Sequence, residues 1–367
     1  MKITDVTITQ SVLPKLDKDW KFALAASSFT EGWIVSITAE DGTVGHGYAS
    51  AMAHYGAPQG AVKGALDLLC KPLKGRNCRD IAAIMEELDH LTSGANQAKS
   101  GIDCALHDLV ARQMGAPIRD LFGGAVTREF ATLRILPIKS PADMAKNARA
   151  LFNKGVRAFK IKVHGEVDLD VARVAAVRAE VGSQARLTVD ANQSYRVKDA
   201  IRALNRMEPY NIDLAEQPVP VADMVGLKEV TRAVAITIEA DEAAYSLEQV
   251  MRLVRDRVVD AISLKITKLG GLRNTLAAAH ICEAGDIRYR LGAHVGPQLL
   301  AAHAVQIASA LPHVWYACEL SEFDGLAEDP WSGLDLRDGV LHITDAPGCG
   351  VNPSAASGIP RGRDAKA

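Results

Sequence analysis

Short apolar runs alternate with amphipathic helical patterns beyond residue 125, and this alternation limits the fold more than any other feature. Each run has the length and composition of a buried strand, and apolar residues recur at three- and four-residue spacing between the runs. Eight strands with seven intervening helices predict an α/β fold, a (β/α)7β modified TIM barrel. The predicted strands span residues 132–137, 158–163, 186–190, 213–216, 236–240, 261–265, 289–291 and 315–319. The predicted helices span about 141–154, 169–181, 197–207, 221–234, 247–255, 272–284 and 297–310.

The first part of the chain has a different pattern. Strand-like segments come first, with Asp41-Gly42 at the centre of a hairpin turn, and three helical patterns follow, so we expect an N-terminal α+β domain. A polar and aromatic stretch at residues 14–30, which holds Trp20, is a candidate lid, since long loops in compact domains usually have a function. A Gly- and Pro-rich tail follows the barrel and is expected to pack back on the first domain. The predicted domains are therefore residues 1–125, 126–320 and 321–367.

The composition argues against several classes of partner. The formal net charge is −2 over 367 residues, which gives no support to binding of nucleic acid or an anionic membrane. No Gly-x-Gly-x-x-Gly motif follows a predicted strand, so the pattern is not that of a dinucleotide-binding fold. No stretch approaches the ~20 apolar residues of a membrane-spanning helix, and the first residues have no apolar signal segment. Scattered cysteines without a Cys-x-x-Cys pair favour free thiols, so we expect a cytoplasmic protein.

Three carboxylates follow one another at the ends of consecutive predicted strands. Asp190, Glu216 and Asp241 are each separated by about one βα unit, so they should share the mouth of the barrel. Three like charges resist joint ionisation unless a cation is present, and an all-carboxylate set suits a hard divalent ion, most simply Mg²⁺. For one carboxylate alone, a cap of the following helix is the commoner interpretation. The agreement of three strands favours a metal site.

Lysines frame these carboxylates. Lys160 and Lys162 are two residues apart on a strand, so their side chains point to the same face. On an edge strand they would be two solvated lysines. Lys265, however, ends the sixth strand, on the other side of the carboxylates. This layout places two candidate bases on opposite faces of one metal-bound carbon acid.

These residues resemble the enolase superfamily, and within it the muconate-lactonizing-enzyme-like subgroup (mandelate racemase/muconate lactonizing enzyme family). Lys160-x-Lys162 is similar to the subgroup's Lys-x-Lys motif, whose second lysine acts as a base, and Lys265 is similar to its base on the sixth strand. The resemblance implies a capping domain whose loops, about residues 14–30 and 51–60, select the substrate, and it implies a homo-oligomer. Three short motifs match the family's Mg²⁺ ligands: Asp190 in Asp-x-Asn, Glu216 in Glu-Gln-Pro and Asp241 in Ala-Asp-Glu.

Two positions depart from the patterns of related subgroups. His294 stands where the mandelate-racemase-like subgroup has a catalytic histidine, but the aspartate that pairs with that histidine is replaced here by Lys265. We therefore expect His294 to be an extra acid or a substrate contact. The eighth strand has Glu319 instead of the Asp-x-Asp associated with dipeptide epimerases, which puts a dipeptide substrate in doubt. Glu319 is either a substrate contact or the structural partner of a barrel lysine. Asn192 and Trp20 are further candidate substrate contacts.

The expected reaction is Mg²⁺-assisted removal of the proton α to a substrate carboxylate by a lysine base, through a metal-stabilised enediolate. Lys162 or Lys265 removes the proton as a neutral amine, and the charge of Lys160 should lower the pKa of Lys162. Return of a proton by the other lysine makes a racemase or epimerase of a carboxylic acid or amino-acid derivative the simplest outcome. A dehydratase of a hydroxy acid and a muconate-type cycloisomerase share the same intermediate. A Schiff-base lysine enzyme or a non-catalytic barrel are alternatives of another class, against which the carboxylates argue.

Overall fold

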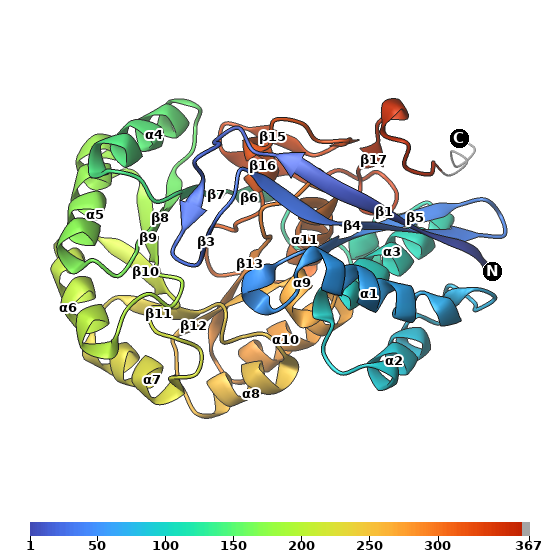
Figure 1. Ribbon diagram of the computed structural model, residues 1–367, viewed down its shortest axis with the longest axis horizontal. Helices are drawn as coiled ribbons and strands as arrows, with labels where there is room; N and C mark the ends of the chain where they lie inside the picture. The colour runs from blue at the N-terminus through green and yellow to red at the C-terminus, as the bar shows by residue number, and fades with distance from the viewer. Residues whose placement is uncertain (362–367) are drawn as a thin grey trace.

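Seven parallel strands form a curled sheet in the computed structural model, which describes residues 1–361 (Figure 1). Residues 362–367, at the end of the predicted third segment, lie outside the described residues. The order of the strands in the sheet follows their order in the chain, because a helical crossover leads from each strand to its parallel neighbour. The strands are β7 (Leu133–Leu136), β8 (Ala158–Lys162), β9 (Arg186–Asp190), β10 (Ile212–Glu216), β11 (Thr237–Ala240), β12 (Ala261–Lys265) and β13 (Arg288–Gly292).

Helices cover the outer face of this sheet, and in Figure 1 the helices from α4 to α8 form an arc around the strands. Their sequences explain this position. In α6 (Val197–Met207), for example, the buried residues Ala200, Ala203, Leu204 and Met207 recur every three or four positions, so one stripe faces the sheet. The alternation predicted from the sequence is confirmed. The other helices are α4 (Pro141–Asn153), α5 (Val167–Val181), α7 (Met224–Ala233), α8 (Leu247–Arg255), α9 (Ile266–Leu269), α10 (Leu272–Ala284) and α11 (Gln298–Ala310).

The eighth predicted strand, residues 315–319, differs from the prediction because it forms no regular strand. Cys318 makes an isolated parallel bridge to Thr132, just before β7, and Glu319 makes another to Gly292 at the end of β13. Trp315 N–H also donates a hydrogen bond to the carbonyl oxygen of Tyr289 in β13 (2.9 Å), but these contacts are isolated and form no continuous ladder. The segment still lies between the first and last strands and closes the barrel.

The N-terminal part forms an antiparallel sheet in the order β1–β4–β5, covered by helices. The longest helix, α3 (Asn96–Met114), is buried along most of its length because it packs between β5 and the barrel helices α9 and α10. Close approach needs small residues: a Cβ added at Gly47 would lie 2.0 Å from the carbonyl oxygen of Gly101. The remaining elements are β1 (Ile3–Pro14), β4 (Phe29–Ala39), β5 (Val44–Ser50), α1 (Gln59–Leu69) and α2 (Ile81–Leu91).

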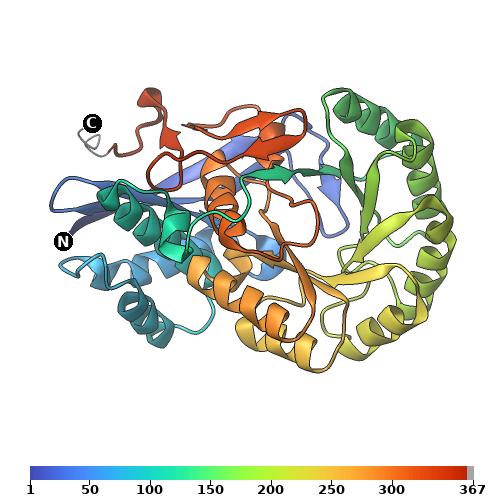
Figure 2. The ribbon, with the colours of Figure 1, turned by 180° about the vertical axis from the view of Figure 1, so that it is seen from behind.

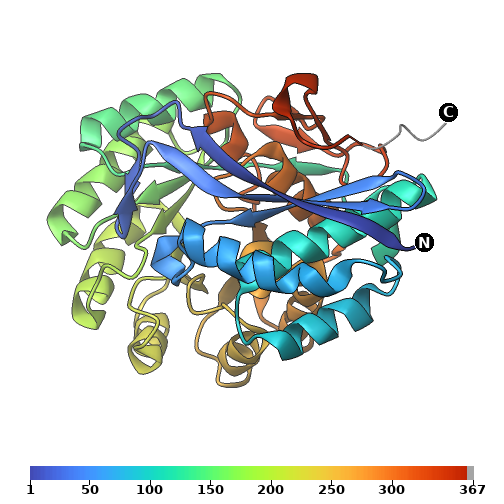
Figure 3. The same ribbon diagram turned by 45° about the vertical axis from the view of Figure 1, so that its right-hand side comes forward.

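The loop between β1 and β4, the predicted lid, extends from this sheet towards the barrel (Figures 1 and 3). It contains a small hairpin of two strands, β2 (Lys21–Phe22) and β3 (Ala25–Ala26). The hairpin contacts the barrel directly, because Ile138 N–H, in the loop after β7, donates a hydrogen bond to the carbonyl oxygen of Lys21 (3.0 Å). The loop is therefore held between the two parts of the molecule.

The tail after the barrel lies beside the N-terminal sheet, as the red segment in Figure 2 shows. It contacts α3, since Asp108 Oδ1 accepts a hydrogen bond from Cys349 N–H (2.7 Å) and Arg112 Nη2 donates to the carbonyl oxygen of Val351 (2.8 Å). The three domain limits remain a prediction. All six cysteines are unpaired. Within residues 1–361, no helix has both the length and the apolar character that a membrane crossing needs.

Candidate active site

The three predicted metal ligands lie on neighbouring strands at the same end of the sheet. Asp190 and Glu216 are the last residues of β9 and β10 and face each other in the parallel register, and Asp241 directly follows β11. All three are almost completely buried, with 0–2 % of each residue exposed. The sheet topology thus brings together the carboxylates that their spacing predicted.

The three predicted lysines each contact one of these carboxylates. Lys162 Nζ lies 2.6 Å from Asp190 Oδ2, and Lys160 Nζ lies 2.6 Å from Glu216 Oε2. Lys265 Nζ lies 2.7 Å from Asp241 Oδ2. Two of these lysines come from β8 and the third from β12, the strands that border β9, β10 and β11. Lysines therefore flank the carboxylates from both sides.

Lys160 is an ammonium group held inside the barrel. Besides Glu216, its Nζ contacts Glu319 and lies 3.6 Å from Asp190 Oδ2. Burial alone would lower the pKa of Lys160, but the attraction of Glu216 and Glu319 raises it well above the usual value. Glu319 therefore contacts a barrel lysine, and its role as a substrate contact remains a prediction.

Two buried cations of the site were missed in the sequence. Arg290 Nη2, from β13, lies 2.5 Å from Glu216 Oε2 and 2.6 Å from Glu239 Oε2. Lys268 Nζ contacts the Asp241 carboxylate and donates to the backbone carbonyl oxygens of Asp241 (2.5 Å) and Ser263 (2.9 Å). A charged residue inside an apolar strand was the available signal for Arg290. For Lys268 the signal was a second lysine one helical turn after Lys265.

The carboxylates have the donor chemistry that Mg²⁺ needs. Glu216 Oε2 is held by Lys160 and Arg290, whereas Glu216 Oε1 is buried and has no hydrogen-bond partner among the described residues. An orphaned carboxylate oxygen beside two further carboxylates fits a hard cation. Burial alone would raise the pKa of Asp241, but Lys265 and Lys268 lower it well below its usual range, so this candidate ligand is anionic.

Another group of ligating atoms lies away from the barrel mouth. This group consists of one oxygen of Asp108, one ring nitrogen of His303 and the Cys349 sulfur, which lie within 4.8 Å of one another. Among residues 1–361, the oxygens of the three barrel carboxylates do not lie that close together. Lysine ammonium groups contact the oxygens of the barrel carboxylates instead. The oxygens of Asp108 already accept bonds from the backbone N–H groups of Cys349 and His46 and from Arg112 Nε. This second group therefore fastens the tail to α3.

A cavity of about 410 Å³ lies between the barrel mouth and the N-terminal loops. Lys162, Asp241 and Lys265 line its floor, and residues of the segments 20–31 and 50–55 line its roof. The four candidate substrate contacts also line this cavity: Trp20, Asn192, His294 and Glu319.

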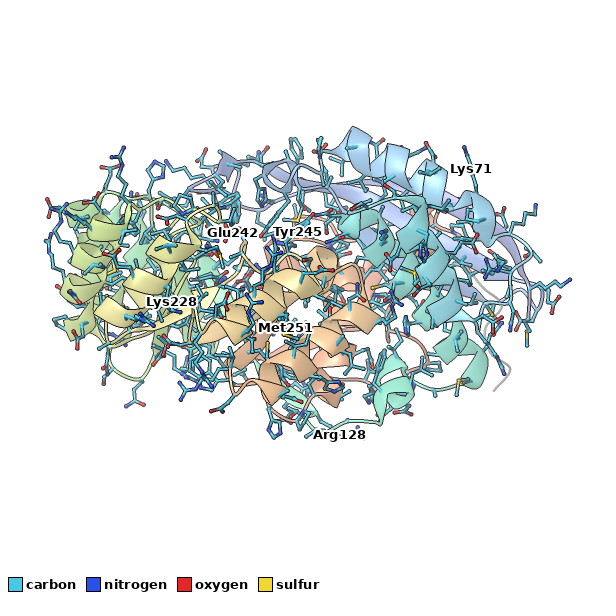
Figure 4. All side chains as sticks on the ribbon, turned by 90° about the horizontal axis from the view of Figure 1, so that it is seen from below. Lys71, Arg128, Lys228, Glu242, Tyr245 and Met251 are labelled. Atoms are coloured by element: carbon cyan, nitrogen blue, oxygen red, sulfur yellow. The ribbon has the colours of Figure 1, made fainter. Side chains whose placement is uncertain are left out.

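One of these candidates, Asn192, is part of a polar network. Asn192 Oδ1 accepts a hydrogen bond from Lys162 Nζ (2.8 Å), and Asn192 Nδ2 donates to Glu242 Oε1 (3.0 Å). Burial, together with the charge of Asp241, raises the pKa of Glu242 to about 8. Figure 4 shows Glu242 and Tyr245 near the centre of the molecule. The hydroxyl group of Tyr245 bonds to the Gln97 side chain of α3, which ties the barrel loop to the N-terminal part.

Aromatic rings form a continuous row in the cavity wall. The ring centroids of Trp20 and Phe22 are 5.5 Å apart, those of Phe22 and His54 are 5.2 Å apart, and those of His54 and Tyr55 are 4.6 Å apart. His294 follows at 5.7 Å from Tyr55. Burial, with a smaller effect of a nearby lysine, lowers the pKa of His294 well below its usual value, so this ring is neutral.

Comparisons with known proteins agree with this arrangement. The family model described as "Mandelate racemase / muconate lactonizing enzyme, N-terminal domain" matches residues 4–123, and "Enolase C-terminal domain-like" matches residues 143–357. A hydrophobic dipeptide epimerase from Enterococcus faecalis is 32 % identical over 96 % of this chain and 100 % of its own. A chloromuconate cycloisomerase from Cupriavidus necator is 30 % identical over 87 % of this chain and 88 % of its own.

Solved structures of epimerases also resemble this chain over nearly its whole length. The substrate-liganded L-Ala-D/L-Glu epimerase from Bacillus subtilis superposes with a TM-score of 0.93 at 29 % identity, covering 97 % of this chain and 100 % of that one. The Enterococcus faecalis epimerase, solved with Mg and the dipeptide L-Leu-L-Tyr, has a TM-score of 0.92 at 32 % identity and covers 96 % of this chain and 99 % of its own.

Proposed function

Because this chain belongs to the mandelate racemase/muconate lactonizing enzyme family of the enolase superfamily, we propose that it moves a proton on the carbon next to a substrate carboxylate. Its relatives are epimerases and cycloisomerases, and these support an enzyme of the isomerase class. The reaction that we propose is racemisation or epimerisation by two lysines, Lys162 and Lys265.

The observation that carries this proposal is the position of the two lysines. Lys162 and Lys265 line the same cavity and lie on strands that border the carboxylate strands from opposite sides. Each contacts a different carboxylate, Asp190 or Asp241, at 2.6–2.7 Å. A carbon acid bound between them would present one face to each amine, which is what inversion of a stereocentre needs.

The residues that would hold Mg²⁺ are Asp190, Glu216 and Asp241. Bound there, Mg²⁺ would take up part of the negative charge that grows on the substrate carboxylate as the α-proton leaves. The permanent charge of Lys160 lies on the same side, because it is locked between Glu216 and Glu319. Lys160 therefore contributes a fixed positive charge and does not act as a base.

Proton transfer requires one lysine to be neutral and the other to be protonated at the start of a turnover. In one direction Lys162 takes the α-proton and Lys265 gives a proton to the opposite face, and in the reverse direction the roles are exchanged. Asn192 holds Lys162 through its side-chain oxygen (2.8 Å), so the amine has a fixed direction towards the cavity. The aromatic row of the cavity wall would exclude water from the reacting carbon.

A cycloisomerase is the second candidate. The chloromuconate cycloisomerase of Cupriavidus necator is 30 % identical, against 28–32 % for the epimerases, and Glu319 stands where an Asp-x-Asp motif is associated with dipeptide epimerases. Such an enzyme needs only one proton-transfer group at the substrate carbon, whereas a racemase needs two.

Proton exchange in D₂O tests the proposal. The enzyme with Mg²⁺ is incubated with a panel of N-acyl amino acids and hydroxy acids, and NMR follows loss of the α-proton signal. We expect deuterium in both enantiomers of an active substrate, and loss of exchange on addition of a chelator. Exchange that survives the chelator, or inactivation by borohydride, would contradict the metal-assisted mechanism and support a Schiff base. No exchange with any acid that the enzyme converts would favour a cycloisomerase.

A further inference from the structure

Lys15 is a buried lysine that the proposed proton transfer does not use. It directly follows β1, at the start of the lid loop, and only 7 % of the residue is exposed. It lines the same cavity as Lys162 and Lys265. A buried ammonium group is costly unless it has hydrogen-bond partners and a counter-charge, so its partners indicate its role.

The partners of Lys15 are few. Its Nζ donates one hydrogen bond to the carbonyl oxygen of Ser27 (3.0 Å) and lies 3.8 Å from the ring centroid of Trp20. Within residues 1–361, no carboxylate oxygen lies within 4.0 Å of this nitrogen. Burial lowers the pKa of Lys15 to about 8. An ammonium has three donors, so Lys15 has capacity left for an acceptor from outside the chain.

The two carboxylates that attract the charge of Lys15 are already paired with other cations. Asp17 and Glu322 both attract the charge of Lys15. Asp17 Oδ1, however, lies 3.0 Å from Lys139 Nζ, and Glu322 Oε1 lies 3.4 Å from Arg134 Nε. Among residues 1–361, Lys15 therefore has no carboxylate partner within ion-pair distance.

The acidic residues that line the cavity do not supply Lys15 with a carboxylate partner either. Glu319 is in contact with Lys160. Glu31 also lines the cavity, but it is only half-buried, so water can solvate its charge without a ligand. The buried charge that lacks a partner in this cavity is thus positive, which favours a substrate with a negative group over one with a free ammonium.

Two aromatic rings connect Lys15 with the proton-transfer site. Lys162 Nζ is 5.3 Å from the centroid of Phe22, Phe22 is 5.5 Å from Trp20, and Trp20 is 3.8 Å from Lys15 Nζ. The two rings thus lie between a cation at the reacting carbon and a cation at the far end. A cavity of about 410 Å³ is within the usual range for such a ligand.

We propose that Lys15 binds a carboxylate at the far end of the substrate, so that the enzyme acts on acids with a second anionic group. An N-succinyl amino acid has this form: one carboxylate next to the reacting carbon and another beyond an amide. This inference rests on the proposed function, since it names the substrate class for the same site. A dipeptide with a free ammonium group does not fit it.

The test compares pairs of acids that differ by the CH₂–COO⁻ end of the acyl group, which carries the far charge. N-succinyl and N-acetyl derivatives of the same apolar amino acids are assayed by α-proton exchange in D₂O with Mg²⁺. A charge-assisted hydrogen bond contributes about 1.5–3 kcal/mol, so kcat/KM should be about 10- to 100-fold higher for the N-succinyl acid. Lys15→Met should remove this preference by raising KM for the N-succinyl acid alone, and Lys15→Arg should restore most of it. Lys18→Met, at an exposed position of the same loop, is the matched control and should keep the preference.

A purely structural role of Lys15, as the tether of Ser27, predicts a different result. Lys15→Met would then lower activity equally for both acids, which would overturn the inference, as would a wild-type enzyme that does not distinguish them. Calorimetric titration of the two acids with Mg²⁺ present gives a second readout that needs no turnover. Tighter binding of the N-succinyl acid that Lys15→Met abolishes supports the inference even if exchange fails and the proposed function is wrong. Equal binding of both acids contradicts it.

Discussion

Arg290 should be one of the most destabilising positions to change in the barrel. Its guanidinium is completely buried, lies 2.5 Å from Glu216 Oε2, and donates three hydrogen bonds of 2.6–3.0 Å to Glu239. Arg290→Met preserves much of the volume but leaves the Glu239 carboxylate buried without its counter-charge. Glu216 loses one cationic partner but keeps Lys160 at 2.6 Å and Lys265 at 3.9 Å.

The size of the effect follows from these contacts. Removal of one partner of a buried ion pair costs about 3–5 kcal/mol, because the other charge remains desolvated, whereas replacement of both partners by apolar groups is often nearly neutral. Total stabilities are about 5–15 kcal/mol, so Arg290→Met should remove a large fraction. We expect a fall in melting temperature of about 4–6 °C, because a chain of this length has an unfolding entropy of about 0.8 kcal/mol/K. Arg290→Met with Glu239→Met should recover most of this loss.

The assay is thermal unfolding of the two single variants and the double variant, followed by circular dichroism. Arg202→Met is the control, because Arg202 pairs with Asp199 on an exposed helix surface and its loss should cost less than about 1 kcal/mol. A melting temperature of Arg290→Met equal to that of the control would refute the reasoning. So would a double variant as unstable as Arg290→Met.

Three further predictions concern the metal ligands, the effect of pH and the contact between α3 and the barrel. Glu216→Gln should weaken Mg²⁺ binding at least about tenfold in calorimetry, while the exposed Glu208→Gln should not, and equal affinities would remove Glu216 from the ligand set. Burial lowers the pKa of His46 to about 4, so the unfolded chain binds more protons between pH 4 and 6.5 and stability falls as pH decreases through this window; His46→Gln should show a smaller loss of melting temperature between pH 7 and pH 5. Gly271→Ala should destabilise the protein by about 2–4 kcal/mol in thermal unfolding, because Gly271 has φ +125° and an added Cβ would lie 2.3 Å from Asp103 Oδ2.

The strands and helices of the barrel could be predicted because their signals are local. The apolar stripe of α10 and the run that forms β9 have the limits found in the structure. The segment at residues 315–319 has the composition of a strand, yet its contacts with the neighbouring strands are isolated bridges and single hydrogen bonds. Whether a run pairs over its whole length depends on the distance between its neighbours, which the run itself does not encode.

The candidate site could be predicted in part for a related reason. Spacing by βα units placed the carboxylates and Lys265 at one end of the sheet, because parallel strands bring their ends together. Contacts across the barrel were not predictable: Arg290 meets Glu216 although 74 residues separate them. Lys15 was also missed, because its isolation from carboxylates exists only in the folded chain. The roles of the metal ligands and lysines remain predictions.

Stereospecific proton exchange in single-lysine variants tests the two-base arrangement most directly. Each enantiomer of an active substrate is incubated with Lys162→Ala or Lys265→Ala in D₂O with Mg²⁺, and NMR records deuterium at the α-carbon. The exposed Lys198→Ala is the control and should exchange and interconvert both enantiomers. We expect each active-site variant to lose interconversion but to retain exchange for one enantiomer, opposite in the two variants, because each lysine faces one side of the carbon. Variants that both retain interconversion, or that exchange the same enantiomer, would contradict the account.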